Sequence, residues 1–113
     1  MSNLSLKESL AGEKTILKLA GELDAKTSTE LKLKLESIAS NGRLKLVCNC
    51  SDLEYIASAG IGILNSMAKY FKEKGGEIVF SNLRKEIRDT MELMYFTKKV
   101  RVFLTEEEAL KAL

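Results

Sequence analysis

The chain has 113 residues, of which 45% are apolar and 30% charged, and its 18 basic and 16 acidic side chains leave a net charge of +2. This length supports one hydrophobic core without metal or disulfide bonds, so residues 1–113 are expected to form a single domain. No basic stripe is interleaved with aromatic residues, which argues against direct nucleic-acid binding. The apolar runs are too short to cross a bilayer and no signal peptide opens the chain, so we expect a cytoplasmic protein without membrane association.

The residue types that the chain lacks exclude several chemistries. There is no histidine, which removes Ser-His and Cys-His nucleophile pairs and most zinc sites. Cys48 and Cys50 are the only cysteines, and at i and i+2 on a predicted strand they would share one face. A bridge between them would be strained, so we expect two reduced thiols in the core and no metal site.

The N-terminal part of the chain has the pattern of a β-hairpin. Leu4–Ser9 alternates like a half-buried strand, residues 11–14 (AGEK) suit a turn, and Thr15–Leu19 is a second apolar stretch. Gly21 is expected to interrupt the strand pattern that precedes it.

The next segment is compatible with two periods. Leu31, Leu33 and Leu35 alternate with lysines as in a strand, whereas Leu31 and Leu35 also fit the i, i+4 spacing of a helix. Asp24 as a candidate N-cap and the Asn-Gly pair at 41–42 as a stop favour the helix. Leu33 would then be an exposed leucine.

The second half of the chain alternates strand and helix patterns. Arg43–Cys48 predicts a mostly buried strand, and residues 49–59 are expected to form a connecting loop. From Gly60 the apolar period becomes helical until the glycine pair at 75–76. The later apolar segments predict a strand at Glu77–Phe80, a helix carrying Ile87, Met91 and Met94, and a strand at Val100–Leu104.

A capping box at Thr105 and Glu108 predicts a short final helix. The order is therefore β-β-α-β-α-β-α-β-α. Such alternation predicts an α/β fold in which about four helices flank a mixed, mainly parallel sheet.

Ser58 and Asp24 both lie where a strand gives way to a helix. In open α/β sheets, functional loops gather at the carboxyl ends of the strands. Serine and aspartate are also favoured N-caps, worth about 1 kcal/mol each, so capping alone is an alternative explanation for either residue.

The residues around Ser58 are unusually small. Gly60 and Gly62 stand near the start of a predicted helix, where glycine costs up to about 1 kcal/mol relative to alanine. With Ala57 and Ala59 they leave little bulk around the hydroxyl. This arrangement suits a partner protein or a kinase active site, although close packing on the sheet would also produce it.

Nucleotide binding and nucleophilic catalysis are both poorly supported at this loop. Asn65 stands where the third glycine of a dinucleotide fingerprint would fall, and no G-K-[ST] follows. Ile56 replaces the first glycine of a nucleophile elbow, and no histidine can activate Ser58. We therefore expect no catalytic residue, no cofactor and no enzymatic activity.

Four segments together resemble the STAS domain of bacterial anti-sigma factor antagonists. They are "GELDAKTSTEL" (21–31), "DLEYIASAGIGIL" (52–64), "GGEIVFSNL" (75–83) and "TEEEAL" (105–110), in one register over nearly the whole chain.

The resemblance implies a domain that binds an anti-sigma factor with serine kinase activity and so releases a sigma factor. The kinase phosphorylates a serine at the loop-to-helix junction, which ends binding, and a serine phosphatase resets the switch. The family serine falls on Ser58, which we expect to cap its helix as well as to accept the phosphate. The partner-contacting aspartate falls on Asp24. The implied partner-binding residues are Asp24, Ala57, Ser58, Ala59, Gly60 and Gly62.

Two positions depart from the common family pattern. Many members carry an acidic residue before the modified serine, where this chain has Ala57, and Ala59 replaces a common second serine. Ser58 is thus the only hydroxyl in the tip "IASAGIG". The first difference bears on which kinase recognises the loop and how efficiently.

Two other functions remain as alternatives. One is a STAS scaffold subunit of a stress-signalling or lipid-transport complex, which would bind another partner without phosphorylation. The other is a small nucleotide-binding protein using the loop at 57–62. For the free protein, a monomer or a weak dimer is expected.

Overall fold

The computed structural model describes residues 3–113, and its element order is the predicted one with a short 3₁₀ helix added. The elements are β1 (Leu4–Ala11), β2 (Lys14–Leu23), α1 (Ser28–Ser40), β3 (Lys45–Ile56), α2 (Ser58–Glu73), β4 (Glu77–Ser81), α3 (Lys85–Leu93), the 3₁₀ helix η1 (Phe96–Lys98), β5 (Val102–Phe103) and α4 (Glu106–Ala112). The five strands form one sheet in sequential order. β1 pairs antiparallel with β2, and all later pairs are parallel, which confirms the predicted mixed α/β sheet.

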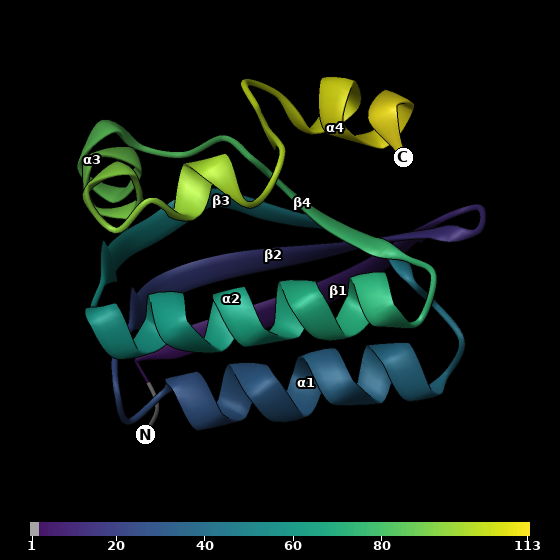
Figure 1. Cartoon of the computed structure of the whole chain (residues 1–113), viewed down its shortest axis with the longest axis horizontal. Helices are drawn as coiled ribbons and strands as arrows, with labels where there is room; N and C mark the ends of the chain where they lie inside the picture. The colour runs from purple at the N-terminus through teal and green to yellow at the C-terminus, as the bar shows by residue number, and fades with distance from the viewer. Residues whose placement is uncertain (1–2) are drawn as a thin grey trace.

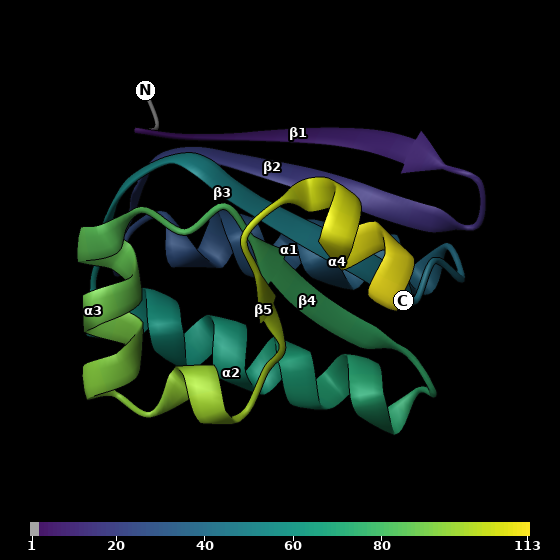
Figure 2. The same cartoon turned by 90° about the horizontal axis from the view of Figure 1, so that it is seen from above.

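Helices cover both faces of this sheet. α1 and α2 lie side by side on one face, and α4 lies on the other (Figures 1 and 2). The main core lies between the sheet and the α1–α2 pair, whereas Ala109 of α4 packs with Val47 and Val79 in a smaller cluster. No helix within residues 3–113 has the length and apolar character that a membrane span requires.

The two long helices bury the faces that the helical spacing predicted. In α1, Leu31 and Leu35 are fully buried while Leu33 is 63% exposed, so the helical alternative is confirmed over the strand. In α2, Leu64, Met67 and Phe71 are buried against the sheet. Strands β3 and β4 pair in parallel from Lys45–Glu77 to Asn49–Ser81, which confirms them as neighbours.

The expected loop at 49–59 is wrong, because β3 continues to Ile56. Its pairing with β2 skips one residue of β3 between Asn49 and Asp52 and another between Leu53 and Tyr55. Each extra residue is a bulge that turns the next side chain to the other face. The buried positions therefore fall at Cys50, Leu53 and Ile56. Because this spacing is three and not two, the segment lacks the alternation by which a strand is recognised in a sequence.

The expected break at Gly21 is also wrong, since β2 runs through it to Leu23. Gly21 has φ +99°, and an added Cβ would collide with the carbonyl oxygen of Asn3. Glycine is required here by a left-handed backbone inside a strand, next to one of the bulges, and does not end the strand.

The C-terminal elements differ from expectation mainly at their ends. α3 buries Ile87 and Met91, but it ends at Leu93, so Met94 follows the helix and is 40% exposed. β5 is only two residues long. The Thr105 hydroxyl accepts a hydrogen bond from the Glu108 N–H at 3.2 Å, which confirms the predicted cap of α4.

Both cysteines are buried and unbridged, as predicted. Burial raises the pKa of the Cys50 thiol to about 12 and that of Cys48 well above its ordinary value. Both thiols therefore stay protonated at neutral pH and serve as apolar core groups.

Candidate functional site

The candidate site lies at the edge of the sheet where β2 and β3 end together. Leu23 pairs with Ile56 at the carboxyl ends of these parallel strands, and the Ala57 N–H donates to the Leu23 carbonyl at 2.9 Å. The turn after Leu23 leads into α1, and Ala57 leads directly into α2. The N-termini of both helices therefore lie at the same end of the molecule (Figure 1).

Asp24 organises the turn that leads into α1. Its Oδ1 accepts hydrogen bonds from the N–H groups of Lys26 at 3.0 Å and Thr27 at 2.9 Å. Its carbonyl accepts from the Ser28 N–H, so Asp24 caps a single turn, and α1 itself begins one turn later than predicted. The hydrogen bond from the Thr27 backbone is the main cause that lowers the Asp24 pKa, and this carboxylate is charged at neutral pH.

Thr27 is a site residue that the sequence analysis missed. It is buried, and its hydroxyl donates to the Glu22 carbonyl at 2.8 Å while accepting from the Asp24 N–H at 2.9 Å. These bonds tie the turn to the end of β2. The reciprocal pattern of a capping residue and a hydroxyl three positions later, Asp24-x-x-Thr27, was the available signal.

Ser58 does not cap α2, which corrects that part of the prediction. It is the first residue of the helix, and Ala57, with φ −97° and ψ 165°, occupies the N-cap position. The Ala57 carbonyl accepts from the N–H groups of Gly60 and Ile61, and the Ala57 N–H donates to the Leu23 carbonyl. Ser58 is exposed, and its hydroxyl makes no hydrogen bond within residues 3–113.

The two glycines of the loop differ in what surrounds them. Gly60 is buried, and an added Cβ would lie 2.7 Å from Cγ and 3.0 Å from the carbonyl oxygen of Leu23. Gly60 thus lets α2 pack closely on the end of β2. Gly62 is exposed, and a Cβ there would meet nothing within 4 Å. Packing against Leu23 explains why residue 60 is glycine, whereas no contact within the described chain explains why residue 62 is glycine.

An exposed platform surrounds Ser58. Ala59 is exposed beside it, Ala57 is half-buried, and Tyr55 at the end of β3 is 52% exposed. Aromatic side chains are enriched where proteins contact one another, and small neighbours allow close approach. Tyr55 was not predicted as a site residue, because the sequence pattern placed it in a loop and not at the end of β3.

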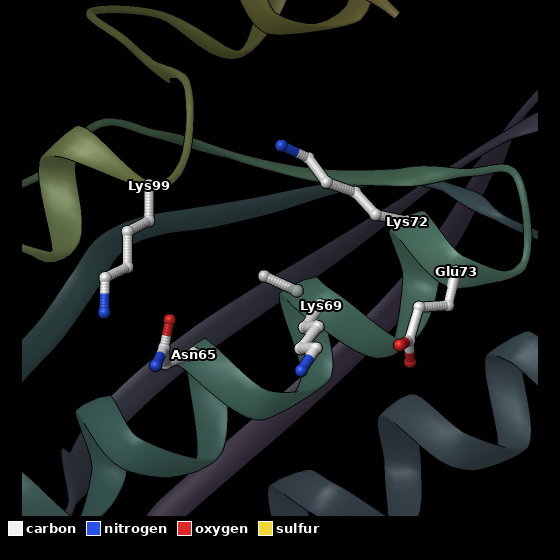
Figure 3. A pocket seen from close by; sticks show the side chains of 6 residues that line it. Asn65, Lys69, Lys72, Glu73 and Lys99 are labelled. Atoms are coloured by element: carbon white, nitrogen blue, oxygen red, sulfur yellow. The ribbon is translucent and has the colours of Figure 1, made fainter.

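Within residues 3–113, no cluster of three or more Cys, Asp or Glu side chains could hold a metal ion. A pocket of about 470 Å³ lies further along α2, between Asn65 and Glu73 on the helix and Lys99 (Figure 3).

The fold and the site define a small α/β domain in which the Asp24 turn and the start of α2 lie at the same end of the sheet. The chain belongs to the STAS domain family, whose model matches residues 7–109. An anti-sigma F factor antagonist of Paenibacillus polymyxa is 23% identical over 99 residues, which cover 87% of this chain and 85% of that protein.

Solved structures share the fold. An anti-sigma factor antagonist from Mycobacterium paratuberculosis has a TM-score of 0.87 at 20% identity, covering 96% of this chain and 92% of that one. The Bacillus cell fate determinant SpoIIAA in its phosphorylated form has a TM-score of 0.74 at 19% identity, covering 96% and 98%.

The two glycines provide a matched prediction. Gly60→Ala should lower the free energy of unfolding, by roughly 1–3 kcal/mol, because the added methyl overlaps Leu23. Gly62→Ala should raise it by up to about 1 kcal/mol, since alanine favours the helix and the position is open. Urea unfolding of both variants measures the difference. Equal destabilisation by the two changes would contradict the packing described here.

Proposed function

We propose that this protein is an anti-sigma factor antagonist switched by phosphorylation of Ser58. With Ser58 unmodified, it binds an anti-sigma factor that is also a serine kinase and so frees a sigma factor. The observation that carries this proposal is the exposed Ser58 hydroxyl, free of hydrogen bonds within residues 3–113, on the first turn of α2.

The family relationship supports the proposal. The relatives described above are named anti-sigma factor antagonists, and SpoIIAA has been solved in both phosphorylated and unphosphorylated forms. The existence of a phosphorylated protein with this fold supports a phosphorylation switch at the exposed Ser58.

The proposed partner surface is the platform around Ser58. Ala57, Ala59 and Gly62 carry little or no side chain, so the backbone of a partner can come close to the start of α2. Asp24 supplies a fixed carboxylate for a basic group of the partner, and Tyr55 supplies an aromatic contact. Gly60 contributes by seating α2 on Leu23.

The phosphoryl transfer requires ATP and a base, and the kinase supplies both. The Ser58 oxygen attacks the γ-phosphorus of ATP, ADP leaves, and the hydroxyl proton passes to a base of the kinase. A serine phosphatase reverses the modification by hydrolysis of the phosphate ester. The accessible hydroxyl and its small neighbours let either enzyme reach the oxygen.

The fold can accept the new charge where the interface cannot. Phosphoserine adds about −1.5 to −2 charges, which the free amides and the positive end of the α2 macrodipole stabilise. In a closed interface the same dianion loses its water. An unpaired buried charge reduces affinity by roughly a hundredfold or more, so binding ends while the domain stays folded.

Three substitutions of Ser58 test the switch. Ser58→Ala should change the free energy of unfolding by less than about 0.5 kcal/mol, because the hydroxyl makes no bond within the described residues. It should keep partner binding and prevent phosphorylation. Ser58→Asp should stay folded, helped by about 0.3–1 kcal/mol from the helix macrodipole, yet bind much more weakly.

Ser58→Asn is the matched control, since it has the shape of aspartate without the charge and should retain most of the affinity. The measurements are melting curves and binding titrations with the anti-sigma factor that co-purifies with the chain. The switch is wrong if the Asp and Asn variants bind equally well and kinase with ATP leaves residue 58 unmodified. A scaffold role without phosphorylation would then be favoured.

Asp24→Asn tests the contribution of the carboxylate. Asparagine still offers an oxygen to the Lys26 and Thr27 N–H groups, so the stability should be nearly unchanged. Loss of a charge-assisted hydrogen bond to the partner should weaken binding by at least about fivefold. Glu107→Gln on α4, across the sheet, is the control for net charge. Unchanged affinity in a calorimetric titration would mean that Asp24 holds the turn but does not contact the partner.

A further inference from the structure

A pocket of about 470 Å³ lies on the surface of α2, away from Ser58. Its lining consists of Asn65, Ala68, Lys69, Lys72 and Glu73 from α2, and Lys99 from the segment after η1. Lys99 faces α2 from the opposite wall, with its chain directed toward Asn65 (Figure 3). Two segments far apart in the sequence therefore border this open hollow.

The charges in this pocket are not balanced by the surrounding protein. Lys69, Lys72 and Lys99 form no ion pair within the part of the chain that the structure describes. Within residues 3–113, the lysines that do form an ion pair are Lys18, Lys34, Lys45 and Lys85. The three pocket lysines differ from the other unpaired lysines in lining one common space. Glu73 is the one carboxylate among the six lining residues, so the lining carries three positive charges and one negative charge.

Neither helix stability nor the Ser58 platform accounts for this arrangement. A lysine in the last turn of α2 stabilises the helix dipole, which explains Lys72 but not Lys99, which lies outside that helix. Ala68 is ten residues from Ser58, which at 1.5 Å per residue is roughly 15 Å along the helix. The pocket is therefore separate from the proposed phosphorylation site.

We propose that this pocket binds a small anion that carries phosphate groups. Lysine ammonium groups are compact, strongly hydrated charges suited to phosphate oxygens, and the Asn65 carboxamide adds a directional donor. Ala68 is small and leaves the floor open, while the aliphatic parts of the lysines form the walls. The volume lies within the range of small-ligand sites.

The proposal does not depend on the role of Ser58. It places an anion site on the second half of α2, well separated from the loop at 57–62, where a nucleotide would have to bind if that loop were a phosphate cradle. A ligand there can coexist with phosphorylation of the first turn of the same helix.

Titration of the ¹⁵N-labelled protein with inorganic pyrophosphate at low salt tests the site. We expect amide shifts confined to the residues around Asn65–Glu73 and Lys99. ADP then shows whether an organic group adds affinity, and vesicles containing phosphatidic acid show whether a lipid headgroup is accepted. Pyrophosphate binding without vesicle binding identifies a free phosphate ligand, and binding to both identifies a headgroup as well.

Lys99→Gln and Lys98→Gln form the matched pair. Both remove one positive charge from neighbouring positions, but the Lys98 ammonium lies 5.6 Å from the centroid of the Tyr95 ring and does not line the pocket. Lys99→Gln should weaken pyrophosphate binding by at least about fivefold, and Lys98→Gln by less than about twofold. Absence of pyrophosphate shifts in the wild type, or equal weakening by both variants, would overturn the proposal.

Discussion

The parallel pairing of β2 and β3 up to their last residues is the constraint on which the rest of the site depends. The Leu23–Ile56 pair and the hydrogen bond from the Ala57 N–H to the Leu23 carbonyl end both strands at one edge. Each strand is followed within a few residues by a helix, and both helices then lie on the same face. The Asp24 turn and the start of α2 are neighbours as a consequence. Gly60 completes the arrangement by allowing α2 to contact Leu23 directly.

This constraint makes the proposed switch local. Ser58 stands on the first turn of a long helix whose buried face, including Leu64 and Phe71, holds it against the sheet. A phosphate at that position is stabilised by the positive end of the helix, so the packing of the core need not change. The effect falls on the partner surface, where a desolvated negative charge without a partner is costly. A rigid junction therefore lets a single charge control binding without refolding.

Much of this arrangement could be predicted from the sequence because it rests on local patterns. Helical spacing identified the buried faces of α1 and α2, the Thr105 capping box marked α4, and the change of period placed Ser58 at a junction. The length of β3 could not be predicted, since two bulges replace period two by a spacing of three. The N-cap role of Ala57 and the pocket beside Lys99 also escaped prediction, because contacts between segments distant in sequence create both.

The most direct test of the central claim is to compare the protein phosphorylated once at Ser58 with the unmodified protein. The phosphorylated form would be prepared with the cognate kinase and ATP. Both forms would be checked by mass spectrometry of the peptide spanning residue 58 and titrated against the anti-sigma factor. We predict nearly identical melting curves and an affinity lower by roughly a hundredfold or more after phosphorylation. Equal affinities for the two forms, or unfolding of the phosphorylated form, would contradict the account.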